Sequence, residues 1–206
     1  MTPTPAGVLL VAAFYGIVAL AATIAVGGIA WQTSRRPSGA QIGQMLVTVG
    51  AAAIGGFAAS RQLTAEEILA SALIVGALSA AAVSRVPTGN RSLEIVGAAF
   101  MIVALAAVLD GMWWTLGGAA IASAPFFGTA AFVRDRRTSA FDGCVAAIAG
   151  LALGRPATAI VVLFLACLAA IAYVKVVRRG SPSARFAPYI ASFTLATVLL
   201  QVALVA

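Results

Sequence analysis

Long uninterrupted apolar segments constrain the fold of this chain more than any other feature. The segment "VGAAFMIVALAAVL" at 96–109 is one example, and similar segments recur along the 206 residues between short polar stretches. Hydrophobic residues make up 62% of the chain and charged residues 9%, whereas a soluble domain is about half apolar and roughly a quarter charged. A soluble fold of this length has no interior large enough to bury so much apolar surface. The sequence therefore predicts an integral membrane protein.

Helices are expected to cross the membrane, because lipid gives the backbone no hydrogen bonds and only helices or closed barrels satisfy them internally. Barrel strands alternate polar and apolar residues, but these segments are continuous and rich in Ala, Leu and Val. A helix needs roughly 20 apolar residues to cross. The predicted fold class is an all-α, polytopic transmembrane helical bundle. Its eight spans lie near 7–31, 40–59, 67–84, 93–109, 113–133, 140–154, 157–177 and 187–205, or seven if the short sixth span is re-entrant.

The basic residues predict the orientation, because Arg and Lys accumulate in cytoplasmic loops. One set of alternate loops has only Arg61 and Arg155. We therefore expect a multi-pass protein of the cell (inner) membrane with both termini outside. The other set of loops carries eleven of the 13 basic residues: Arg35, Arg36, Arg85, Arg91, Arg134, Arg136, Arg137, Lys175, Arg178, Arg179 and Arg185.

A single integral membrane domain is expected over 1–206, because no long polar linker interrupts the spans. The first span has no basic residue before it and Arg35 and Arg36 after it, so it is expected to be a retained helix and not a cleaved signal peptide. The predicted partner from composition is membrane lipid. Nucleic acid is not expected, because the basic residues are scattered between hydrophobic segments.

Several classes of chemistry are excluded by the residue types. The chain has no histidine, which excludes histidine metal sites and Ser/His or Cys/His catalysis. Cys144 and Cys167 lie in apolar segments without a CxxC motif, and we expect them to pack as small buried residues. We expect no metal and no cofactor.

Five of the six acidic residues have local explanations as helix starts, a turn and a loop. They are Glu67, in a predicted capping box with Thr64, and Glu66 beside it; Asp110, in a turn with Gly111; Asp135, among loop arginines; and Glu94, in the first turn of the fourth span.

The sixth acid, Asp142, has three possible roles. Ser139 and Asp142 have the S-x-x-D spacing of a capping box, which would place both at the start of the sixth helix. In that case Asp142→Asn should cost about 1 kcal/mol or less. Acids within membrane segments are also often proton sites or catalytic groups, so these two roles stay open.

Three motifs in order resemble the type IV prepilin leader peptidases, which are membrane aspartic proteases. Asp142, Gly150 and Gly154 match the spacing that follows the family's second catalytic Asp. The segment "RFAPYIA" at 185–191, with Pro188, resembles the start of the family's last helix, and "SRVPTGN" at 84–90, with Pro87, resembles the stretch after its first catalytic Asp. The resemblance covers 66–206 and leaves two extra spans in 1–65. It implies a helical bundle with its active site at the cytoplasmic face.

The same comparison shows departures from the family at catalytic positions. The first catalytic Asp would fall at Ala80, and no acid is nearby in "LSAAAVSRVP". Ser139 and Phe141 replace two motif glycines, and Cys144 replaces a lysine. Aspartic catalysis needs two carboxylates that share a proton. Asp110 would lie a membrane thickness away, roughly 30 Å, so Glu94 is the one conceivable substitute.

Three functional hypotheses follow. The leading hypothesis is a catalytically inactive member of this family that binds prepilin-like transmembrane helices or supports a pilus or secretion assembly. The second is an active endopeptidase that uses Asp142 with Glu94 or with a partner chain. The third is a small proton-coupled transporter with Asp142 as its proton site, although the spans show no buried charged pair and no convincing inverted repeat.

The predicted topology can be tested with reporter fusions in the segments 134–139 and 178–186. Both fusions should report a cytoplasmic location, because these segments belong to the basic set of loops. A periplasmic signal from either position would contradict the orientation.

Overall fold

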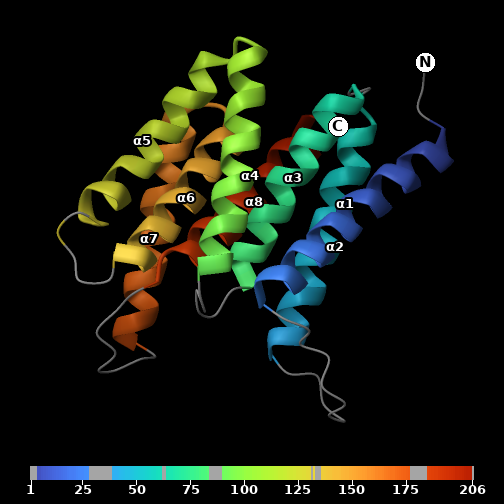
Figure 1. Cartoon of the computed structure of the whole chain (residues 1–206). Coiled ribbons are helices and arrows are strands. Elements are labelled where there is room, and N and C mark those ends of the chain that lie inside the picture. The colour runs from blue at the N-terminus through green and yellow to red at the C-terminus, as the bar shows by residue number, and fades with distance from the viewer. Residues whose placement is uncertain are drawn as a thin grey trace.

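The part of the chain that the structure describes forms eight α-helices, in agreement with the eight predicted apolar segments. The structure, a computed structural model, describes residues 4–27, 39–61, 64–83, 90–130, 132, 136–176 and 185–205, and no strand occurs in these ranges. Figure 1 shows the helices side by side in a bundle. The helices are α1 (Pro5–Gly27), α2 (Gly39–Ala59), α3 (Ala65–Val83), α4 (Asn90–Leu109), α5 (Trp113–Ala130), α6 (Arg136–Leu153), α7 (Pro156–Val176) and α8 (Ala187–Val205).

Length and composition support a membrane location. Five of the described helices, α1, α2, α3, α7 and α8, are long and apolar enough to cross a membrane. Shorter apolar stretches occupy Val96–Leu109 in α4 and Thr138–Leu153 in α6. The protein is therefore a helical membrane protein, while the count of eight spans and the orientation stay predictions. Pro87, Asp135 and most of the predicted basic loops lie outside the described residues.

Successive helices run in alternating directions, so every second connection lies at the same end of the bundle (Figure 1). We call one end the basic end, because it carries Arg136, Lys175 and Arg185 at the start of α6, the end of α7 and the start of α8. We call the other the acidic end, because Glu66 and Asp110 lie there, at the start of α3 and the end of α4. This alternation decides which distant residues can meet.

Helices α1, α2 and α3 form one part of the core. Tyr15 is completely buried and packs with Ala51, Ala72 and Val75. Its hydroxyl group forms a hydrogen bond with the Ser71 hydroxyl group. A Cβ atom at Gly55 would lie 2.7 Å from the Tyr15 ring, so the absence of a side chain there lets α2 approach α1.

Helices α5 and α6 approach each other backbone to backbone. A Cβ atom at Gly150 would lie 2.5 Å from the carbonyl oxygen of Gly118 and 2.7 Å from the Cα atom of Ala119. Neither of these backbone atoms can rotate away as a side chain can. Small residues permit this kind of close packing in lipid, where dispersion contacts hold helices together.

Gly150→Ala should destabilise the protein by about 1–3 kcal/mol, because the added methyl group forces α5 and α6 apart. Gly117→Ala is the matched control: a Cβ atom there has nothing within 4 Å, and alanine favours a helix over glycine by up to about 1 kcal/mol. The midpoint of unfolding in an SDS titration measures both. Equal midpoints for the two variants would refute the close approach.

Candidate functional site

Asp142 lies in the second turn of α6, at the basic end. Its side chain is 4% exposed, between the equally buried Phe141 and Gly143. Phe141 and Val145 belong to the large core cluster that also contains Ala187 and Ile190 from α8. A carboxylate in such a place must be well solvated by hydrogen-bond donors, because burial of an unpaired charge is very costly.

The carboxylate of Asp142 accepts hydrogen bonds from the first backbone N–H groups of α8. The N–H group of Ala187 donates to Oδ1 at 2.8 Å, and that of Phe186 donates to Oδ2 at 3.4 Å. The first N–H groups of a helix have no partner within the helix, and their partial positive charge favours an anion. Asp142 therefore caps α8 from a position on α6.

The local sequence of α8 fits this cap. The carbonyl oxygen of Phe186 accepts hydrogen bonds from the N–H groups of Tyr189 and Ile190, so the helical pattern begins at Phe186. Pro188 has no N–H group and suits the first turn of a helix, where a donor would have no internal partner. The carboxylate thus accepts hydrogen bonds from N–H groups that have no acceptor within α8.

The predicted capping box of Ser139 and Asp142 is wrong. Helix α6 begins at Arg136, four residues before the predicted start at 140, so Ser139 lies inside the helix and is not its first residue. Arginine is a good helix former. The polar residues from Arg136 onward therefore extend α6 on the N-terminal side of its apolar stretch. Asp142 is a cap, but of another helix.

The other proposed site residues lie apart from this cap. Glu94 is exposed on α4, and no hydrogen bond joins its side chain to Asp142. Asp110 is exposed at the acidic end. Ala80, where the family resemblance requires an acid, is 2% exposed. Its neighbours Ala77 and Ala81 belong to the cluster that contains Phe141, so this part of α3 meets α6 through apolar contacts.

The two motif glycines have structural functions in this chain. Gly150 lies at the close approach of α5 described above. Gly154 has a φ of 66°, a left-handed conformation that glycine adopts without strain. Its N–H group donates to the carbonyl oxygen of Gly150 at 3.3 Å, which is the hydrogen bond of a glycine C-cap. The spacing of Gly150 and Gly154 therefore follows from the end of α6.

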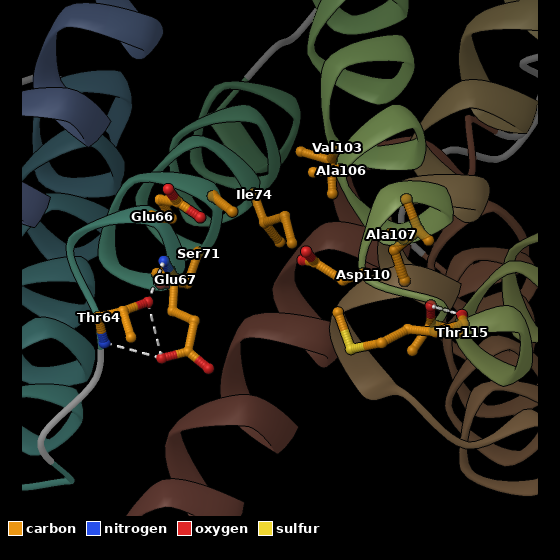
Figure 2. A pocket seen from close by; sticks show the side chains of 13 residues that line it. Thr64, Glu66, Glu67, Ser71, Ile74, Val103, Ala106, Ala107, Asp110 and Thr115 are labelled. Carbon is orange, nitrogen blue, oxygen red and sulfur yellow. Dashed lines mark hydrogen bonds between the residues drawn. The ribbon is translucent and has the colours of Figure 1, made fainter.

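A cavity of about 380 Å³ lies at the acidic end, between α3 and α4 (Figure 2). The predicted capping box at its rim is confirmed: the Thr64 N–H group donates to Glu67 Oε2 at 2.8 Å, and the Glu67 N–H group donates to Thr64 Oγ1 at 3.3 Å. The sequence does not predict this cavity, because each acid has its own local explanation, although alternating spans place the start of α3 beside the end of α4. The lining residues are Thr64, Glu66, Glu67, Ala70, Ser71, Ile74, Val103, Ala106, Ala107, Asp110, Met112, Thr115 and Leu151.

Among the described residues, no group of three or more Cys, Asp or Glu side chains is placed to hold a metal ion. Comparison with known protein families, curated proteins and solved structures finds no match for this chain.

Asp142→Asn should destabilise the protein by about 1–3 kcal/mol, because the amide NH2 group faces a backbone donor and leaves it without an acceptor. This exceeds the cost expected for a cap at the start of α6. Glu94→Gln removes an exposed carboxylate at the same end and should leave the SDS unfolding midpoint unchanged. Equal midpoints for Asp142→Asn and Glu94→Gln would contradict the cap on α8.

Proposed function

We propose that this protein is a catalytically inactive, multi-pass membrane protein with a fold like that of the prepilin leader peptidases, and that it acts by binding other membrane proteins. One observation carries the proposal. The Asp142 carboxylate is buried and accepts hydrogen bonds from the Phe186 and Ala187 N–H groups. A general base must reach the water molecule or substrate from which it takes a proton, and this carboxylate is occupied as a helix cap.

The missing second carboxylate supports the same proposal. In an aspartic dyad, one carboxylate activates water while the other donates a proton. The corresponding position in α3 is Ala80, which is buried among apolar residues. Glu94 is exposed and would have to enter the core beside Phe141 to act with Asp142. The cost of burying that charge opposes such a movement.

A binding role is supported by an apolar groove between α5 and α7. Its volume is about 500 Å³, and Pro125, Phe126, Phe164, Cys167 and Phe186 are among the residues that line it. Pro125 lies inside α5, where it removes one backbone donor and favours a bend. The groove includes Phe186, which Asp142 holds in place. We propose that a transmembrane helix of a prepilin-like partner, or of a pilus or secretion assembly, lies here.

The proposal is tested by incubating the purified protein in lipid with a prepilin from its own source and measuring the mass of the substrate. We expect no removal of the leader peptide, because loss of general acid–base catalysis typically costs about 10²- to 10⁴-fold and the loss of both roles of the dyad should cost more. An active peptidase of the family, assayed on the same prepilin, is the positive control.

Leader removal that disappears in Asp142→Ala would contradict the proposal. Glu94→Gln would then show whether the exposed glutamate serves as the second carboxylate. Cleavage that survives both substitutions would come from a contaminating peptidase, and repurification would have to remove it.

A further inference from the structure

The acidic-end cavity has an apolar interior. Ile74 on α3, Val103 on α4 and Leu151 on α6 contribute to its walls, and Val103 and Leu151 are buried. Alanines at 70, 106 and 107 line both sides, and their short side chains leave space that larger residues would fill. The volume of about 380 Å³ is within the range of roughly 300–1,000 Å³ that is usual for small-molecule sites.

Three carboxylates lie on the walls of this cavity. Figure 2 shows Asp110, directly after the end of α4, with its carboxylate directed toward α3, across the cavity from Glu66. Glu67 Oε2 accepts a hydrogen bond from the Thr64 N–H group, whereas within the described part of the chain no hydrogen bond or ion pair engages the carboxylate of Glu66 or Asp110. The described residues that line the cavity include no Lys or Arg. The negative charge of these carboxylates is therefore not balanced by a basic side chain in the cavity wall.

Carboxylates beside apolar walls favour an organic cation over a divalent metal ion. A bare divalent cation takes six or more oxygen ligands in a compact shell, whereas most of the lining here is hydrocarbon. An organic cation can place its positive group near the carboxylates and its hydrocarbon part against Ile74, Val103 and Leu151. Glu66 and Asp110 are exposed, so water screens their attraction for the cation, and the apolar walls supply the larger part of the binding free energy.

We propose that the acidic-end cavity binds hydrophobic ammonium compounds, which are small molecules with one positively charged amine and an apolar body. The site lies at the opposite end of the bundle from Asp142 and does not depend on the function proposed above. The apolar walls provide most of the contact area, and the carboxylates of Glu66 and Asp110 select the positive charge.

A pair of probes of similar shape and opposite charge tests this selection. Calorimetric titration of the purified protein in detergent is carried out with 4-phenylbutylamine, which is an ammonium ion at pH 7, and with 4-phenylbutyrate. Titrations into empty micelles are subtracted. The amine should bind saturably with one site per chain, and the carboxylate should bind at least tenfold more weakly. Equal binding of the two probes, or no saturable binding of the amine, would overturn the proposal.

Two kinds of variant locate the site. The double substitution Glu66→Gln with Asp110→Asn should weaken amine binding at least tenfold, and Ala106→Phe should do the same by filling the cavity while keeping its charge. Glu94→Gln removes one carboxylate at the basic end and should bind the amine as the unsubstituted protein does. Unchanged binding in both cavity variants, with SDS unfolding midpoints like that of the unsubstituted protein, would place the amine elsewhere and refute the site.

Discussion

The start of α8 has backbone N–H groups that no residue within the helix can satisfy, and α8 begins inside the protein core. Water is scarce there, so these donors need an acceptor from another part of the chain. Asp142 supplies it from α6, 45 residues before Ala187 in the sequence. The favourable interaction of its charge with the helix terminus compensates for burying the carboxylate. Contacts of α6 with α5 and of α8 with α3 then depend on where this cap holds the two helices.

This constraint gives a physical reason for a motif that resembles a catalytic one. Asp142 binds the amides of α8, Gly150 permits the approach of α5, Gly154 ends α6, and Pro188 suits the first turn of α8. Each residue is explained by folding alone. Such a pattern can therefore persist in a chain that has Ala80 where the family resemblance requires the first catalytic Asp, and its presence does not by itself indicate peptidase activity.

The helices were predictable from sequence because the length of an apolar segment and its polar borders directly reflect the membrane requirement. The prediction of 187–205 for the last helix agrees with Ala187–Val205. The local S-x-x-D pattern predicts that α6 starts at 140, but the helix already begins at Arg136 and includes the polar residues before the apolar stretch. The partner of Asp142 was not predictable in the same way, because a side chain's contact with a distant helix depends on how the helices pack. The cavity was not predictable for a related reason. A helix start accounts for Glu66 and a turn accounts for Asp110, so nothing in the sequence links the two residues.

The central claim is that the Asp142 carboxylate binds the first amides of α8. Residue-resolved amide hydrogen exchange in the intact protein and in Asp142→Asn measures this interaction directly, because exchange at an amide requires its hydrogen bond to open. The account predicts faster exchange at Phe186 and Ala187 in the variant, with unchanged protection in the middle of α8 around Thr194, whose side chain and backbone are buried. Identical exchange at Phe186 and Ala187 in the two proteins would contradict it.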